Sequence, residues 1–125
     1  MKEKSGNSSL GKTGESIATT FLKGAGFRIL ERNFRCVCGE IDIVARDGRS
    51  LVFVEVKCRN NKAYGPPQLA VTAFKQRQIS KAALVWLSKR RLFDADARFD
   101  VVAIVLHEHD LPEIEHIRNA FDLAY

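Results

Sequence analysis

The chain has 125 residues, enough for one domain with a single hydrophobic core. No apolar run approaches the roughly 20 residues that cross a bilayer. The polar N-terminal stretch MKEKSGNSSLGK also lacks the apolar segment of a secretory signal. We therefore expect a cytoplasmic protein that is not embedded in a membrane. The net charge of +5 favours a polyanionic partner such as a nucleic acid, because such partners release counterions on binding.

The three cysteines are an odd number without disulfide-framework spacing, which suits a reducing compartment. Cys36 and Cys38, together with His107 and His109, contain the ligand types of a tetrahedral zinc site. Both pairs are spaced more tightly than zinc ligands usually are, and nothing in the sequence shows that the pairs meet. Free thiols and surface histidines are therefore the better account.

The N-terminal residues 1–10 contain only one large apolar side chain, so we expect a loose tail before a single domain over residues 11–125. A helix is expected from a Thr13 cap to about residue 25, with Gly26 ending it. Its apolar residues recur every three to four positions, which predicts one buried face. That face comprises Ile17, Ala18, Phe21, Leu22 and Ala25.

Three strands are expected next, over residues 27–33, 40–46 and 51–58, with a strong hairpin signal at Asp47-Gly48. A break at residues 65–67 precedes a long amphipathic helix over residues 72–89. Its inner face comprises Ile79, Ala82, Ala83, Trp86 and Leu87. Strands over residues 99–106 and 113–117 complete the order α-β-β-β-α-β-β. This order predicts an α/β fold in which one mixed sheet of about five strands is flanked by helices.

The third predicted strand ends in charged residues. Alternation puts Val52, Val54 and Val56 on one face, and Phe53, Glu55 and Lys57 on the other. Charges are costly to bury unless something pairs with them. Selection for stability alone would rarely put Glu55 and Lys57 on a central strand, so both are candidates for a function.

The second predicted strand supplies partners, because Glu40 and Asp42 share one of its faces. Directly opposed residues of an antiparallel hairpin point to the same side. If residues 47–50 form the loop, residues 46 and 51 pair, which sets Asp42 opposite Glu55 and Glu40 opposite Lys57. A two-residue loop slides the register by one pair but keeps all four on one face, whereas an unbulged three-residue loop would separate them. The expected result is three carboxylates and one ammonium on one side of the sheet.

Closely set carboxylates repel each other unless a cation neutralises them. A hard divalent cation such as Mg²⁺ (or Mn²⁺) does so with oxygen ligands, and the Val56 carbonyl could supply one more oxygen. Such a cation lowers the pKa of water and stabilises the charge that develops on a phosphodiester. Lys57 could position the water or stabilise the developing anion. The pattern therefore indicates phosphodiester hydrolysis.

Plainer explanations exist for the same residues. Acid–lysine pairs on strands are common, so Asp42 or Glu55 could form an ordinary salt bridge with Lys57. Glu15 falls in the first turn of the first helix, where an acid usually serves the helix dipole. The apolar setting and the register of two strands favour the functional explanation for the strand residues.

Asp42, a hairpin and then Glu55-x-Lys57 resemble the motif of the PD-(D/E)xK, restriction-endonuclease-like nucleases, although Ile41 replaces the usual proline. The match is closer to the YraN family of small bacterial proteins, which is related to archaeal Holliday junction resolvases. The matching stretches are GESIATTFL, ILERNFR, GEIDIVARDG, LVFVEVKCR, YGPP, AVTAFKQRQI and RFDVVAI. They cover nearly everything from residue 11 to residue 104.

The resemblance implies a restriction-endonuclease-like domain with Asp42 and Glu55 as metal ligands and Lys57 as the catalytic lysine. An acid of the first helix joins the metal site in the resolvase-like branch, and in this chain that residue is Glu15. The implied function is a metal-dependent endonuclease acting on DNA, in particular on branched or structured DNA in repair or recombination. Glu40 has no firm role in the general motif.

This nuclease fold also includes inactive members, so the alternative is a nucleic-acid-binding or scaffolding protein that has lost catalysis. Junction resolvases act as homodimers because two strands are cut symmetrically. The resemblance therefore leaves a homodimer open for this chain, although no apolar stripe in the sequence points to one.

Basic residues follow the candidate site along the chain. Lys75, near the start of the long helix, could face the same cleft as Glu55. We predict nucleic-acid contacts for Lys75, Arg59, Lys62 and Tyr64, with a solvated helix face or a rigid turn as the alternative. Arg98 and Asp100 are expected to form a structural ion pair, and Trp86 is expected in the core.

Overall fold

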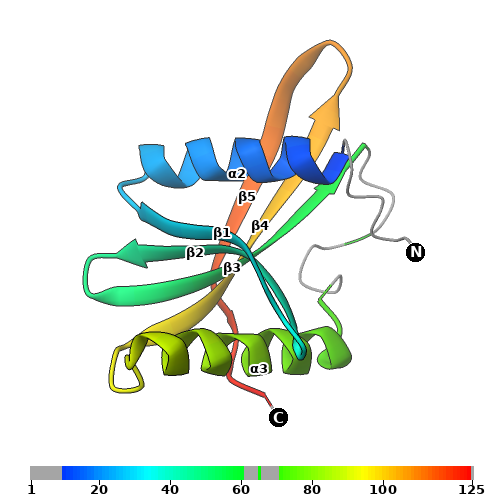
Figure 1. Cartoon of the computed structure of the whole chain (residues 1–125). Coiled ribbons are helices and arrows are strands. Elements are labelled where there is room, and N and C mark those ends of the chain that lie inside the picture. The colour runs from blue at the N-terminus through cyan, green and yellow to red at the C-terminus, as the bar shows by residue number, and fades with distance from the viewer. Residues whose placement is uncertain (1–9, 61–64, 66–70, 125) are drawn as a thin grey trace.

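The computed structural model describes residues 10–60, 65 and 71–124. Figure 1 shows a sheet with one helix on each side. The elements in chain order are α2 (Lys12–Gly24), β1 (Arg28–Cys36), β2 (Gly39–Asp47), β3 (Ser50–Arg59), α3 (Ala73–Arg90), β4 (Ala97–His107) and β5 (Asp110–Phe121). This order confirms the predicted fold class. Apart from residue 10, the tail predicted for residues 1–10 lies outside the described residues.

The five strands form one sheet in the order β1-β2-β3-β4-β5. All neighbours are antiparallel except β3 and β4, which are parallel and are connected through α3. A parallel pair needs such a crossover connection, so the helix between β3 and β4 makes the sheet mixed. Both faces of the central strand β3 are covered, which explains why its residues 51–55 are all buried.

The two helices bury opposite faces of the sheet. On one face, Ala18 and Leu22 of α2 pack in a cluster with Ile43, Val52 and Val54. On the other face, the predicted inner face of α3 packs against a second cluster that includes Val44, Leu51 and Phe53. Trp86 is only 1 % exposed, as expected for a core residue, and its indole donates to Glu31.

Helix α2 begins earlier than the sequence predicts. Gly11 already has helical dihedral angles and caps the helix without a side-chain hydrogen bond, so Thr13 lies inside the first turn and its predicted capping role is wrong. The predicted stop is confirmed, because Gly26 follows the helix with a positive φ of 94°. Neither helix in the part of the chain that the structure describes is long and apolar enough to cross a membrane.

The β2–β3 hairpin has the register that a loop over residues 47–50 predicts. Arg46 pairs with Leu51, and Asp47 pairs with Ser50 across a turn at Gly48 and Arg49. In Figure 1, the N-terminal ends of α2 and α3 lie on opposite sides of the sheet, and the C-terminal end of β3 lies beside the N-terminal end of α2.

Candidate functional site

Glu55 lies near the end of β3, and it is only 5 % exposed. Its Oε2 atom is 3.4 Å from the Nζ atom of Lys57 and 3.8 Å from the Nζ atom of Lys75. Lys57 follows on the same face of β3, whereas Lys75 reaches the acid from the first turn of α3. The salt bridge between Glu55 and Lys57 is the contact that the plainer explanation expects, and the expectation that Lys75 faces the same acid is confirmed.

Asp42 is joined to β3 through its side chain. The β2–β3 ladder ends at the pair Ile43–Val54, so the predicted backbone pairing of Asp42 with Glu55 and of Glu40 with Lys57 is wrong. Instead, the backbone N–H of Val56 donates to Oδ2 of Asp42 at 2.8 Å. The carboxylate therefore takes the place of the next ladder bond, and it lies beside Glu55.

The electrostatic surroundings of Asp42 disfavour its charge. Burial raises the pKa of Asp42 well above its ordinary value, and repulsion from Glu55 raises it further. The Val56 hydrogen bond and Lys75 lower that pKa, and the charge of Glu15 raises it, without reversing the net shift. Asp42 and Glu55 therefore form a pair of neighbouring acids whose charges the protein compensates only in part.

Glu40 does not join these acids because β2 bends between Ile41 and Ile43. Ile43 packs on the α2 side of the sheet, whereas Ile41 packs on the α3 side, although residues two apart on a regular strand share a face. This bend in β2 lies opposite Asn33 of β1, which has a positive φ of 56°. Glu40 pairs with Arg35 instead, at 3.5 Å. The predicted cluster of three strand carboxylates is thus reduced to Asp42 and Glu55.

Glu15 is presented by the first turn of α2. Its Oε1 accepts hydrogen bonds from the side chains of Asn33 at 2.9 Å and Arg32 at 3.3 Å. Its influence on the pKa of Asp42 shows that Glu15 lies near the other acids. Neither residue that holds Glu15 is predicted from the sequence, although asparagine is enriched at positive φ and could have marked the bend at position 33.

A glycine lets α2 lie directly on β3 next to this site. A Cβ atom on Gly14 would lie 2.6 Å from the Cβ atom of Cys58, closer than side-chain atoms approach. Gly14 is buried and immediately precedes Glu15, so this close contact fixes the acid at the end of β3. The Cys58 side chain is partly buried in this contact, and its burial raises the pKa of the thiol.

The predicted metal ligands were Asp42, Glu55, Glu15 and the Val56 carbonyl. Within the described residues, no three Asp, Glu, His or Cys side chains converge closely enough to hold one metal ion. The acids are held apart by the contacts described above, with Glu15 on Asn33 and Arg32. The donor set is nevertheless of the right chemistry for a hard divalent cation, since two carboxylates repel each other and all the donors are oxygens.

The predicted nucleic-acid contacts are placed only in part. Lys75 lies at the site, and Arg59 is the last residue of β3. Lys62 and Tyr64 lie outside the described residues. Of the residues considered for a zinc site, Cys36 is the last residue of β1 and Cys38 lies in the β1–β2 turn, whereas His107 lies at the end of β4 and contacts Glu113. All three cysteines are free thiols.

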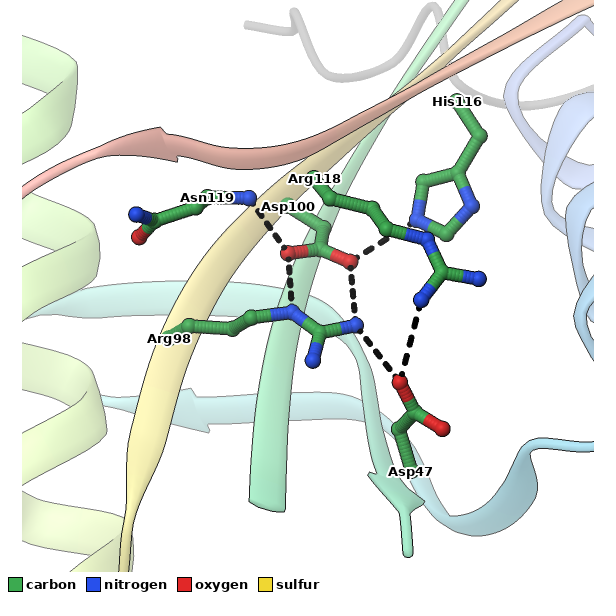
Figure 2. Close-up of polar contacts among 6 residues, drawn as sticks. All are labelled: Asp47, Arg98, Asp100, His116, Arg118 and Asn119. Carbon is green, nitrogen blue, oxygen red and sulfur yellow. Dashed lines mark hydrogen bonds and ion pairs between the residues drawn. The ribbon is translucent and has the colours of Figure 1, made fainter.

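A second group of charged residues lies on β4 and β5 near the β2–β3 turn (Figure 2). Asp100 is fully buried and accepts hydrogen bonds from Arg98, from His116 at 2.8 Å and from the backbone N–H of Asn119 at 3.0 Å. Burial alone would raise the pKa of Asp100, but these hydrogen bonds outweigh burial and lower it. The predicted ion pair between Arg98 and Asp100 is confirmed, at 2.9 Å.

This second group extends to the surface through Asp47. Its Oδ2 atom lies 3.0 Å from Arg98 and 3.2 Å from Arg118 (Figure 2). His116 packs edge-on against Phe27, which also lies below the two guanidinium groups. These contacts tie β5 to β4 and to the end of β2, so the group has the features of a structural network.

The fold and the acid pair define an α/β protein with a mixed sheet and a candidate site at one end of it. A model of the family described as "Uncharacterised protein family UPF0102" matches residues 14–104. A UPF0102 protein of Geotalea daltonii is 70 % identical over 122 residues, which cover 98 % of this chain and 96 % of that protein. The chain therefore belongs to the UPF0102 family, and the predicted resemblance to the YraN family is confirmed at this level.

Other relatives match over the same extent. A UPF0102 protein of Geotalea uraniireducens is 64 % identical over 124 residues, covering 99 % of this chain and 98 % of that protein. A UPF0102 protein of Geobacter metallireducens is 66 % identical over 119 residues, covering 95 % and 97 %. The similarity thus includes every element of the sheet.

Proposed function

We propose that this protein is a metal-dependent endonuclease that hydrolyses phosphodiester bonds of DNA. The observation that carries the proposal is the acid pair Asp42 and Glu55 on neighbouring strands, accompanied by Lys57 on the face of Glu55. The order of these residues resembles the motif of PD-(D/E)xK nucleases. Neighbouring acids whose charges are compensated only in part are explained better by a ligand than by stability.

Asp42 and Glu55 would hold Mg²⁺ or Mn²⁺. The Val56 carbonyl would supply a further oxygen. The N–H and C=O of one strand residue lie on the same edge of the strand, and the N–H of Val56 donates to Asp42, so its carbonyl lies on the edge that faces Asp42. Glu15 would join through its position on α2. When bound, such a cation acidifies water and neutralises the negative charge that develops on a phosphodiester.

Lys57 and Lys75 supply the positive charge at the reacting phosphate. Their side chains are 28 % and 32 % exposed, so both can reach a ligand while Glu55 stays buried. An ammonium group in this position orients a nucleophilic water or stabilises the anion that forms. The net charge of +5 favours the approach of DNA. Branched or structured DNA, in repair or recombination, is the substrate that the resemblance to junction resolvases supports.

A cleavage assay tests the proposal. Purified protein is incubated with linear, single-stranded, flapped and four-way DNA, with Mg²⁺, with Mn²⁺ or with EDTA. We expect cation-dependent cleavage that falls about 100- to 1000-fold in Glu55→Gln and in Lys57→Ala, as when one preorganised catalytic group is lost. Glu108→Gln and Lys81→Ala are matched controls, because these residues are exposed and lie away from the site. Cleavage that is absent, or equal in all variants, refutes the proposal.

A catalytically inactive nucleic-acid-binding or scaffolding protein is the second candidate. It is favoured by the contacts that already satisfy the acids, since Glu55 contacts two lysines and Glu15 contacts Asn33 and Arg32. Such a protein would bind DNA equally well in EDTA and in Mg²⁺, with an affinity that falls steeply with salt. Fluorescence anisotropy with labelled DNA, together with calorimetry that detects no divalent-cation binding, would support this candidate over the enzyme.

A further inference from the structure

One oxygen of the buried Glu55 is shared by two lysines that come from different elements. Lys57 lies on the same strand, whereas Lys75 lies on α3 and also lowers the pKa of Asp42. The contact of Lys75 is the longer one, at 3.8 Å, and its side chain is 32 % exposed. Lys75 can therefore leave Glu55 without leaving that carboxylate unpaired, because Lys57 still contacts it.

Lys75 also borders a cavity of about 300 Å³ between the β1–β2 hairpin and α3. The residues lining it are Arg35, Cys36, Gly39, Glu40, Lys75 and Gln78. The hairpin end reaches the N-terminal half of α3 in Figure 1. A Cβ atom on Gly39 would lie 3.2 Å from both the Cβ atom and the carbonyl oxygen of Gln78, so the turn rests directly on the helix. This close contact holds the two walls of the cavity together.

Three residues of the lining have the chemistry of a phosphate site, whereas Glu40 adds one carboxylate, which contacts Arg35. A guanidinium group from Arg35, an ammonium group from Lys75 and an amide from Gln78 can all donate hydrogen bonds to phosphate oxygens. Arg35 contacts Glu40 at a loose 3.5 Å and keeps most of its side chain exposed, so its guanidinium group can turn to an anion. A phosphate bound here would compete with Glu55 for Lys75.

We infer that the cavity binds a phosphate group and that Lys75 exchanges between Glu55 and that phosphate. Phosphate in the cavity then removes one of the two ammonium groups that occupy Glu55, which frees this acid for a divalent cation. By thermodynamic reciprocity, a cation on Glu55 strengthens phosphate binding in the cavity. The link to a cation rests on the proposed function, whereas the exchange of Lys75 between two anions does not.

A double-mutant cycle without any metal tests the exchange itself. The probes are dimethyl phosphate, which models a nucleic-acid linkage, and inorganic phosphate, each titrated calorimetrically in EDTA at constant ionic strength. Glu55→Gln releases Lys75, so phosphate affinity should rise about 5-fold or more, the lower end of typical coupling. In the Lys75→Gln background, the same Glu55→Gln change should have little effect. An equal rise in both backgrounds shows a general field effect and overturns the inference.

Two further results decide on the cavity and on the source of the phosphate. Arg35→Gln should weaken phosphate binding, whereas Lys81→Gln, which removes a lysine from the exposed face of α3, should not. Coupling with dimethyl phosphate assigns the cavity to a nucleic-acid strand, and coupling with inorganic phosphate alone assigns it to free phosphate. If neither probe binds, the inference is wrong. Circular dichroism of each variant excludes unfolding as the cause.

Titration of Mg²⁺ then tests the link to the acid pair. In wild type, the Kd for Mg²⁺ should fall about 5-fold or more when dimethyl phosphate is present. Lys75→Gln should lower the Kd for Mg²⁺ without phosphate and abolish this coupling. Lys57→Gln is the matched control, since Lys57 contacts the same oxygen but does not line the cavity, so its coupling should persist. Absence of Mg²⁺ binding in all proteins would refute the metal site and leave the outcome of the metal-free cycle valid.

Discussion

Two groups of residues in the sheet contain buried carboxylates, but their surroundings differ. In the first group, Asp100 of β4 lies opposite Val54 of β3 and accepts hydrogen bonds from Arg98, His116 and a backbone amide, which lower its pKa. In the second group, the acid pair, Asp42 accepts a hydrogen bond from Val56 but lies beside Glu55, and its pKa is raised. The first acid is stabilised in its charged form by the fold, whereas the second is not.

This difference separates a structural charge from the one that we propose to be functional. The partners of Asp100 lie on β4 and β5, and Arg98 extends the group to Asp47 at the end of β2, so the charge of Asp100 helps to hold these strands together. The acid pair offers no comparable benefit to folding, because the repulsion between Asp42 and Glu55 opposes it. Natural proteins tolerate such unfavourable local electrostatics mainly at functional sites. Neutralising Asp100 and neutralising Asp42 should therefore change stability in opposite directions.

The largest change in stability is expected for Asp100→Asn. It removes the buried charge that compensates Arg98 and that accepts the hydrogen bond of His116, and breaking a buried ion pair from one side costs about 3–5 kcal/mol. Urea unfolding at neutral pH measures the loss. Glu108→Gln, on an exposed turn, should change the free energy of unfolding by less than about 0.5 kcal/mol. A cost for Asp100→Asn as small as that of this control would show that the network is not structural.

A smaller loss in the free energy of unfolding is expected for Gly14→Ala, next to Glu15. The added Cβ atom would lie 2.6 Å from the Cβ atom of Cys58, so α2 must move, at a cost of about 1–3 kcal/mol. The movement displaces Glu15, and we expect weaker Mg²⁺ binding as well. Gly24→Ala is the matched control, because nothing lies within 4 Å of its added Cβ atom and alanine is the better helix former. Equal stability of the two variants would contradict the close contact of α2 with β3.

Asp42→Asn should raise stability in the absence of metal. Asparagine can still accept the hydrogen bond from Val56, while the repulsion with Glu55 disappears. We expect a gain of about 1 kcal/mol in the free energy of unfolding at pH 7, the usual size of a stabilising substitution. Differential scanning calorimetry in EDTA measures it. A destabilised variant would show that the charge of Asp42 supports the fold, as that of Asp100 does.

The smallest effect is a difference in pH dependence. The pKa of Asp100 is lowered, so its contribution to stability is present above the ordinary carboxyl value of about 3.9 and is lost as pH falls through the lower folded value. The pKa of Asp42 is raised, so its penalty is present at high pH and disappears as pH falls toward about 3.9. Urea unfolding between pH 8 and pH 3 should show Asp42→Asn losing its advantage over wild type as acid is added. A constant advantage would contradict the raised pKa.

Much of the fold follows from local patterns in the sequence. Alternation placed Phe53 and Glu55 on one face of β3, and the turn chemistry at Gly48 set the register of Arg46 with Leu51. The apolar positions of α3 likewise predicted which face is buried. Each of these patterns repeats within a few residues, so a single sequence is enough to detect it.

The parts that could not be predicted depend on contacts between distant segments. The bend that carries Glu40 away from Asp42 lies opposite Asn33 on a different strand, and the ion pair of Asp47 with Arg118 spans 71 residues. The close packing that requires Gly14 is visible only when α2 meets β3. No local periodicity reports such pairs. For Lys75, the sequence predicted a place in the same cleft as Glu55, but not that Lys57 and Lys75 share one oxygen of this acid.

The effect of Mn²⁺ on unfolding tests most directly the central difference between the Asp100 group and the acid pair. The free energy of unfolding is measured with and without Mn²⁺ for wild type, Asp42→Asn and Asp100→Asn. At a concentration 100 times the Kd, binding to the native state should add about 2.7 kcal/mol to wild type. We predict that Asp100→Asn keeps this gain despite its lower stability and that Asp42→Asn loses it. An equal gain in Asp42→Asn, or no gain in wild type, would contradict the assignment of the acid pair to a cation.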